Sequence, residues 1–206
     1  MIIETAGLRL QPVSHDDLPD LVALDADPAV MRFVSGGPAT AADQIADWVI
    51  PRMQAALREH GAGMWVLRPR SGDGFLGWVQ LRRPRHSRAR ELELSYRLRR
   101  EQWGRGLAVQ ASAALIAVMF TDSDTDRIFA STHPANAASR RVMEKLGMRL
   151  ASGVGADDRH FPAQHRPGGP ALPEAAAPDV EYELLREHWL LTRGRGSSGA
   201  PESLPA

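Results

Sequence analysis

The sequence predicts an α/β fold in which a mixed, mainly antiparallel sheet is flanked by about four helices. Three β-rich runs, 63–69, 74–83 and 91–98, follow one another with short polar connections, as in an antiparallel meander. The alanine-rich stretch 106–120 is apolar on more than one side, which is typical of a helix packed between layers. The strand-like run 127–132 follows it, so strands and helices belong to one domain.

The N-terminal part supplies one strand and two helices. Apolar and polar residues alternate over 8–13, which predicts a half-buried strand. Ser14 and Asp17 have the spacing of a capping box, so a helix is expected to begin there and to end before Pro28. Apolar residues then recur at helical spacing through 41–60, which predicts a second helix.

The C-terminal part supplies a helix, a closing strand and two irregular segments. The helix is expected over 136–148 and the strand over 179–189. Between them lies 153–178, rich in Gly, Pro and Ala, which is either a functional loop or partly disordered. We therefore predict one domain over 1–190 and a flexible tail over 191–206.

Composition excludes several classes of function. Basic and acidic residues number 25 each, so no overall field favours nucleic acid or a membrane surface as a partner. There is no cysteine, which rules out disulfides, cysteine metal ligands and a thiol nucleophile. No leader pattern and no apolar stretch of about 20 residues is present, and a cytoplasmic location is expected.

The stretch "QWGRGLA" at 102–108 predicts an anion site. It lies between a strand and a helix start, where free backbone N–H groups and the positive end of the helix dipole converge. Gly104 and Gly106 leave these donors unobstructed, and Arg105 adds a positive charge. The alternative is that the two glycines only serve a tight turn.

Two common phosphate motifs do not fit this stretch. A P-loop requires lysine after its last glycine, and the only lysine is Lys145. A dinucleotide fingerprint requires a small residue where Val109 stands and an acidic residue at the end of the next strand.

Two motifs resemble the GNAT N-acetyltransferase superfamily, in particular its ribosomal-protein alanine N-acetyltransferase branch. They are "ELSYRLRREQWGRGLAVQASAALIAVMF" and "STHPANAASRRVMEKLGM", with weaker support from "LRLQPV", "DADPAVMRFV" and "YELLREHW". The resemblance implies a seven-stranded sheet with a central splay that admits acetyl-coenzyme A. It also makes a homodimer plausible.

The same resemblance assigns the coenzyme contacts. The coenzyme diphosphate is expected over Gly104–Ala108, and its pantetheine arm beside the strand, where it pairs with free backbone groups. The first loop position departs from the family's Gln or Arg, so no side-chain contact is assumed there. The expected contacts are Tyr96, Leu98, Trp103, Gly104, Arg105, Gly106, Leu107, Ala108, Asn136, Ser139 and Arg141.

Acetyl transfer to an amine requires a base and an acid. Glu93 is the expected base, because it lies three residues before the strand tyrosine and shares one face with Glu91 and Ser95. The alternative is a solvated carboxylate paired with arginine, or a base acting through water. The family's tyrosine acid falls on Met143, which cannot donate a proton, so Ser139 or water is expected to protonate the thiolate.

The resemblance thus implies an acetyl-coenzyme A-dependent N-acetyltransferase acting on a primary amine by direct attack in a ternary complex. Another acyl donor, such as succinyl-coenzyme A, and a coenzyme-binding protein without turnover are the alternatives. The acceptor stays open between a protein N-terminus, an amino acid, a polyamine and an aminoglycoside.

No metal is expected. His160 and His165 match no common ligand spacing, and the chemistry needs no metal. Candidates for lining the acceptor pocket, with core packing as the alternative for the aromatic ones, are Phe33, Trp65, Trp78, Asp157, Asp158, His160, Phe161 and His165.

Overall fold

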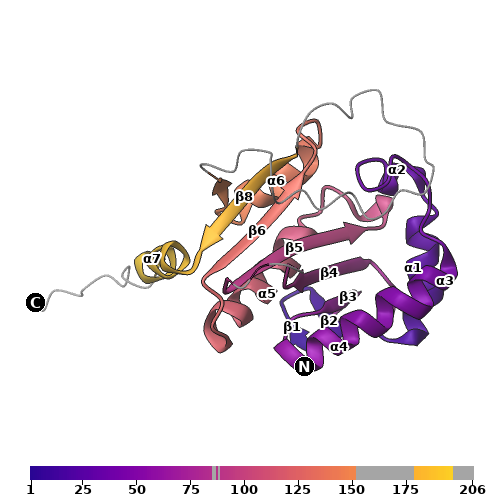
Figure 1. The fold of residues 1–206 in the computed structure, drawn as a ribbon, viewed down its shortest axis with the longest axis horizontal. Coiled ribbons are helices and arrows are strands. Elements are labelled where there is room, and N and C mark those ends of the chain that lie inside the picture. The colour runs from indigo at the N-terminus through magenta and orange to yellow at the C-terminus, as the bar shows by residue number, and fades with distance from the viewer. Residues whose placement is uncertain (85–86, 88, 152–178, 197–206) are drawn as a thin grey trace, which may run out of the picture.

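A computed structural model describes residues 1–84, 87, 89–151 and 179–196 (Figure 1). Its strands form one sheet in the order β1-β2-β3-β4-β5-β6-β8-β7. Every neighbouring pair is antiparallel except β5 and β6, which are parallel. The strands are β1 (Ile3–Glu4), β2 (Leu8–Pro12), β3 (Met64–Pro69), β4 (Gly77–Arg82), β5 (Glu91–Leu98), β6 (Arg127–Thr132), β7 (Arg149–Leu150) and β8 (Val180–Leu185).

The predicted fold class is confirmed, and the strand count differs slightly. The described residues form eight strands where the resemblance implied seven. The sequence pattern itself marked six of them, because β1 and β7 are two-residue edge strands too short to leave an alternating pattern. The helices are η1 (His15–Asp17), α1 (Leu18–Asp25), α2 (Pro28–Met31), α3 (Ala42–Gln44), η2 (Ile45–Val49), α4 (Ile50–His60), η3 (Arg100–Gln102), α5 (Leu107–Asp122), α6 (Ala137–Lys145) and α7 (Arg186–Gly196).

The helix predicted over 41–60 is interrupted by a π-helical turn. Elements α3, η2 and α4 are continuous, and the N–H of Ile50 bonds to the carbonyl of Ile45, five residues earlier. Pro51 stands at the start of α4 and has no N–H to donate into the preceding turn. We attribute the wider turn to this missing donor.

The closing strand is shorter than predicted. Strand β8 ends at Leu185, and α7 begins at Arg186, so the prediction of a strand to 189 was wrong beyond 185. The helix brings the Trp189 ring to 5.4 Å from the ring of Phe120 on α5, a contact that an extended chain would direct elsewhere. Helix α7 also includes 191–196 of the expected tail. The domain boundary at 190 stays a prediction, and 153–178 and 197–206 lie outside the described residues.

The sheet splits between β5 and β6. Register pairing covers only Glu91–Arg127, Leu92–Ile128 and Glu93–Phe129. Beyond these pairs β5 continues to Leu98 beside β4, and β6 continues to Thr132 beside β8. The expected central splay is therefore present, and it opens toward the C-terminal ends of both strands (Figure 1).

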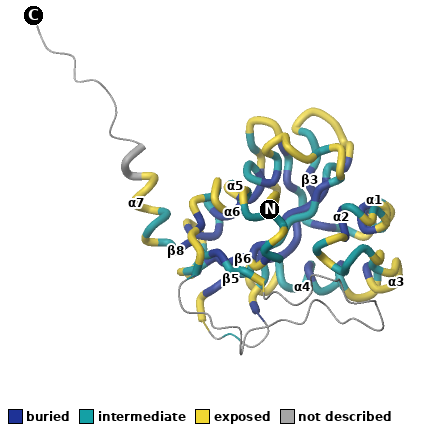
Figure 2. The backbone as a smooth tube through the Cα atoms, turned by 90° about the horizontal axis from the view of Figure 1, so that it is seen from above, coloured by how far each residue is buried: buried dark blue, intermediate teal, exposed yellow. Residues whose placement is uncertain are grey.

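Two apolar cores lie on opposite sides of the sheet. We call the side packed against α5 the α5 face, and the side packed against α1, η2 and α4 the α1 face. Buried positions run through the strands in the middle of the molecule, whereas exposed positions mark the outer turns of the helices (Figure 2). On β5, Leu94 and Tyr96 belong to the α5 face, and the alternate residues Glu93, Ser95 and Arg97 belong to the α1 face.

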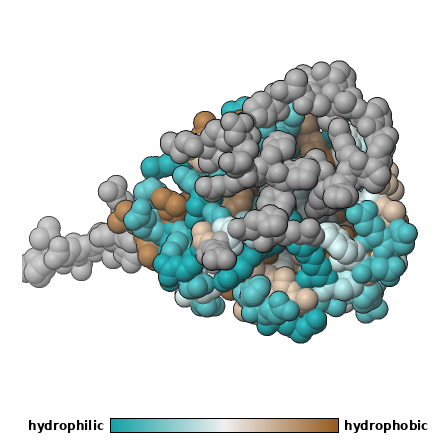
Figure 3. Space-filling model, viewed as in Figure 1, coloured by the Kyte–Doolittle hydropathy of each residue, from teal (hydrophilic) through white to brown (hydrophobic). Residues whose placement is uncertain are grey.

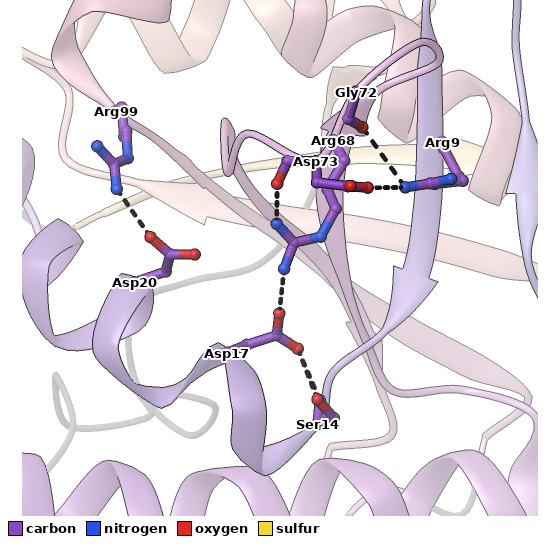
Figure 4. A network of polar contacts seen from close by, with 8 residues as sticks. All are labelled: Arg9, Ser14, Asp17, Asp20, Arg68, Gly72, Asp73 and Arg99. Carbon is purple, nitrogen blue, oxygen red and sulfur yellow. Dashed lines mark hydrogen bonds and ion pairs between the residues drawn. The ribbon is translucent and has the colours of Figure 1, made fainter.

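Arginine–aspartate pairs fix α1 to the sheet. Arg68 of β3 donates to Asp17 at 2.6 Å, and Arg99 donates to Asp20 at 2.9 Å (Figure 4). Asp17 also accepts the backbone N–H of Ser14 at 2.8 Å, which confirms the predicted capping box. Helix α1 thus forms a fixed wall over the α1 face.

No helix of the described residues is long and apolar enough to cross a membrane. The largest exposed apolar side chains at the C-terminal side are Leu190 and Leu191 of α7, near the brown atoms at the α7 end of the molecule in Figure 3.

Candidate active site

The loop between β5 and α5 presents a side-chain-free surface. Gly104 and Gly106 have φ angles of 74° and 76°, in the left-handed region that favours glycine. A Cβ atom built on either residue meets no other atom within 4 Å. The turn therefore needs glycine for its backbone conformation, and the space above both residues is open, while the anion site stays a prediction.

The first turn of α5 has no side-chain cap. Gly106 is the N-cap, and the first helical hydrogen bond runs from Gln110 N–H to the Gly106 carbonyl. The N–H groups of Leu107, Ala108 and Val109 consequently have no partner within the helix. Because α5 has 16 residues and no acidic residue in its first turn, this end is suited to an anion.

Trp103 and Arg105 are engaged within the loop itself. The Trp103 indole donates to the Leu98 carbonyl at 3.0 Å, although 47% of the residue is exposed. Arg105 donates to the Gln102 side chain. The Leu98 carbonyl is already bonded and is not free to bind the coenzyme. Trp103 holds the loop against the end of β5.

The edge of β5 beside the splay offers unpaired backbone groups. Hydrogen-bonded pairs alternate along an antiparallel strand, and Arg99 N–H donates to the Leu76 carbonyl at 3.0 Å. Because successive residues of a strand point their backbone groups to opposite edges, those of Arg97 and Arg99 face β4, and those of Tyr96 and Leu98 face the splay. Strand β6 no longer pairs there, so the N–H and carbonyl of Tyr96 face the opening.

A hydrogen bond across the opening joins β5 to α6. The Tyr96 hydroxyl lies 2.9 Å from Ser139 Oγ and 3.1 Å from the Ser139 carbonyl. Burial raises the pKa of Tyr96 to about 12, although the hydrogen bond with Ser139 acts in the opposite direction. The hydroxyl thus stays protonated near neutral pH and can donate to Ser139.

Asn136 caps α6. Its Oδ1 accepts from Ser139 N–H at 3.2 Å, and its Nδ2 donates to Thr132 Oγ1 at 3.1 Å. Both ends of the amide are thus used in fixing α6 to the end of β6, so its predicted coenzyme contact stays a prediction. Of the two neighbouring arginines, Arg140 bonds to Tyr182, whereas the exposed Arg141 has no side-chain contact among the described residues.

Glu93 lies on the α1 face at the point where β5 and β6 separate. It is the last β5 residue paired with β6, opposite Phe129. Its carboxylate forms an ion pair with Arg82 at 2.7 Å, with 16% of the side chain exposed. The alternative drawn from the sequence, a carboxylate paired with arginine, is thus correct as to the pairing, and the catalytic role stays a prediction.

A second ionic group ties the two parts of the sheet together on the same face. Arg127 of β6 donates to carboxylates on β5 and β8, at 2.8 Å to Glu91, 2.5 Å to Glu181 and 2.6 Å to Glu183. Burial lowers the pKa of Arg127, but these hydrogen bonds outweigh it and hold the pKa above its ordinary value. Sequence reasoning missed these partners because they lie far apart in the chain and meet only through strand register.

The aromatic candidates separate into two groups. Trp65 and Trp78 are buried core residues, so the packing alternative holds for them. Phe33 is half-buried, and its ring stacks at 5.8 Å on that of His133, which follows β6. The remaining candidates, Asp157, Asp158, His160, Phe161 and His165, lie outside the described residues. Within the described part of the chain, no group of three or more His, Asp or Glu side chains could hold a metal ion.

The family profile described as the acetyltransferase (GNAT) domain matches residues 7–149. The chain belongs to the GNAT acetyltransferase family. It is therefore an acyltransferase, and GNAT acetyltransferases use acetyl-coenzyme A as donor. The matched span includes the loop at 104–108, the splay and α6.

Similar proteins support the family assignment. The FsC-acetyl coenzyme A-N(2)-transacetylase of Aspergillus fumigatus is 28% identical over 198 residues, covering 91% of this chain and 77% of that protein. A GNAT acetyltransferase from Bacillus anthracis has a TM-score of 0.69 at 20% identity, covering 91% and 99% of the two chains. The ribosomal L7/L12 alpha-N-protein acetyltransferase RimL, solved with coenzyme A, has a TM-score of 0.68 at 18% identity, covering 90% and 98%. The two structures establish the fold.

Proposed function

We propose that this GNAT protein transfers an acetyl group from acetyl-coenzyme A to a primary amine by direct attack in a ternary complex. The observation that carries the proposal is that β5 separates from β6 after Glu93 and leads to the loop whose Gly104 and Gly106 have open space above them. The carboxylate of Glu93 belongs to the last residue paired before this separation.

The coenzyme fits the residues that are present. The N–H groups of Leu107, Ala108 and Val109 bind the diphosphate at the positive end of α5, and Arg141 adds a charge nearby. The Tyr96 backbone pairs with the pantetheine amides as a neighbouring strand would. When bound, the coenzyme supplies an activated thioester.

Glu93 accepts the proton of the amine. An alkylammonium has no lone pair, so a base must take a proton before or during attack. Glu93 stands on the α1 face, where the splay begins, and the ion pair with Arg82 orients its carboxylate. The distance between Glu93 and the amine decides whether the proton moves directly or through water.

Ser139 donates a proton to the departing sulfur. Met143, at the position of the family's tyrosine, is fully buried and has no proton to give. Tyr96 holds Ser139 in place, because its hydroxyl donates to the Ser139 carbonyl and also lies within hydrogen-bond distance of Ser139 Oγ. Tyr96 is thus a positioning residue for Ser139.

Release of the free coenzyme thiol, followed over a library of amines and a panel of acyl-coenzyme A thioesters, tests the proposal. Acetyl transfer to at least one primary amine, with the acetylated product identified by mass spectrometry, is expected. A preference for succinyl-coenzyme A would show that the donor is not acetyl-coenzyme A. Tight coenzyme binding without thiol release for any amine would show that the protein binds the coenzyme without catalysing transfer.

The A. fumigatus relative bears on the acceptor. Its printed name specifies transfer to a nitrogen, N(2), and the match covers nearly the whole of this chain. The library therefore contains nitrogen acceptors of both kinds, small-molecule amines and peptide N-termini.

A further inference from the structure

The splay is bridged on the α1 face as well as on the α5 face. The ring of Phe33, which follows α2, stacks on the ring of His133, which follows β6, with centroids 5.8 Å apart and planes inclined by 20°. Helix α2 packs into the core of the α1 face through Val30. Phe129, four residues before His133, pairs with Glu93 on that face, so strand alternation directs His133 to the same side. The two rings therefore connect the two parts of the sheet near the end of β5 (Figure 1).

The two bridges lie at the same level of the splay. Strands β5 and β6 are parallel, and their last register pair is Glu93–Phe129. Continuing that register by four residues brings Arg97 level with His133, directly after Tyr96. The Tyr96 hydroxyl forms the bridge on the α5 face. A pantetheine arm that pairs with the Tyr96 backbone would therefore lie between the two bridges, with one on either face.

The bridge on the α1 face is the one that can open. Tyr96 makes two hydrogen-bond contacts with α6, at 2.9 and 3.1 Å, whereas the stack is a contact between two half-buried rings. Phe33 belongs to the connection 32–41, which has neither helix nor strand, and in which Gly36 and Gly37 have φ angles of 83° and 111°. A connection of this kind changes conformation at a lower free-energy cost than a packed strand or helix.

We propose that Phe33 and His133 are coenzyme-binding residues, whose stack closes over the pantetheine arm as a clasp and opens to admit the arm sideways to the edge of β5. An arm that enters sideways meets its backbone partners on the strand edge together, whereas one that enters end-on must slide past them. The clasp thus controls how fast the coenzyme enters and leaves. The position of the arm rests on the proposed function, but the identity of the acceptor does not enter.

A covalent lock on the clasp tests the inference. The chain contains no cysteine, so Phe33→Cys/His133→Cys carries the only two thiols, and a short bis-maleimide can join them. Binding of acetyl-coenzyme A, which has no free thiol to react, is measured by calorimetry and gel filtration. A clasp joined before the coenzyme is added is expected to abolish binding. A clasp joined in the saturated protein is expected to retain acetyl-coenzyme A through gel filtration.

The same double variant treated with N-ethylmaleimide is the control for the lock. It carries the added bulk at both positions without the covalent bridge, so it should bind and release acetyl-coenzyme A.

Dissociation kinetics test the clasp without cross-linking, and they decide the matter if the double variant does not fold. In Phe33→Ala, the dissociation rate constant of acetyl-coenzyme A is expected to rise about two- to tenfold, the value of one aromatic pair. His133→Phe keeps a stack of two rings and should retain slow dissociation, which a role of the imidazole proton would not allow. Val34→Ala, at the exposed neighbour of Phe33, is the control.

Two results would overturn the inference, and they separate it from the proposed function. Acetyl-coenzyme A that binds and leaves freely with the clasp joined in either order would reject the clasp and leave the acetyltransferase proposal standing. An unmodified protein that binds no acetyl-coenzyme A would reject both.

Discussion

The proposed coenzyme cradle and the proposed acceptor floor are built from different parts of the chain. The cradle, Gly104–Ala108, presents backbone N–H groups on consecutive residues, and its glycines keep side chains away. The floor, on the α1 face, presents side chains, Glu93 from β5 and its partner Arg82 from β4, brought together by strand register. A site made of backbone should tolerate loss of its side chains, whereas a site made of side chains should not.

The largest effect is expected on the floor. Glu93→Gln keeps the shape of the side chain and removes the base, so kcat is expected to fall about 10²–10⁴-fold, the usual contribution of a general base. Steady-state kinetics with a saturating amine measures it. Glu101→Gln, on the exposed η3, is the control and should leave kcat unchanged. An unchanged kcat in Glu93→Gln would show that Glu93 is not the base.

The next effect is expected in the cradle when a side chain is added. Asn tolerates the left-handed conformation, so Gly106→Asn mainly fills the open space over the N–H groups. The Kd for coenzyme A is expected to rise about 10–100-fold, as for the loss of one or two charge-assisted hydrogen bonds.

Gly61→Asn is the matched control for this change. Gly61 caps α4 with φ of 67° and equally open space, but it lies outside the cradle. Its replacement should leave the coenzyme Kd unchanged by calorimetry. Equal Kd values for the two variants would show that the glycines only shape a turn.

Tyr96 provides a test at alkaline pH. Its pKa is raised by burial from 10.0 to about 12, so the folded protein keeps a proton that the unfolded chain loses between these values. The free energy of unfolding therefore falls as pH rises above about 10, and Tyr96 accounts for roughly 1 kcal/mol of the loss by about pH 11. Denaturation of Tyr96→Phe at pH 9 and 11 should show a decrease smaller by that amount. If the free energy of unfolding decreases equally in both proteins, the Tyr96 hydroxyl is exposed to water and its pKa is not raised.

The smallest effect is expected from removing the charge of Arg141 on α6. Arg141→Gln should raise the coenzyme Kd only about two- to fivefold, because an exposed arginine contributes little and salt screens it. The effect should shrink further in high salt. Arg149→Gln, at another exposed arginine, serves as control. A rise in Kd as large as that of Gly106→Asn would contradict the proposal that backbone N–H groups provide most of the coenzyme binding.

The same contrast explains what the sequence predicted. The proposed cradle is contiguous, so its two glycines and the helix after them could be recognised in the seven residues 102–108, whereas the positive φ angles of both glycines were found in the structure. Strand alternation placed Glu93 and Ser95 on one face correctly. The partners Arg82 for Glu93, Ser139 for Tyr96 and the indole of Trp103 for Leu98 depend on register and helix packing, which no local pattern encodes.

The strand β8 was overextended for a related reason. Residues 186–189 carry no helix start signal, and the turn into α7 depends on the contact of Trp189 with Phe120, which is distant in the chain. Two-residue strands such as β7 are likewise defined only by their neighbours.

Among the described residues, three register pairs join β5 to β6, and Arg127 of β6 bonds to carboxylates of β5 and β8. A pantetheine arm lying along Tyr96 would bond to the β5 edge where β6 no longer pairs, as an additional strand does. The coenzyme is then a folding ligand as well as a reagent, so saturating amounts should slow amide hydrogen exchange at Tyr96 and raise the melting temperature.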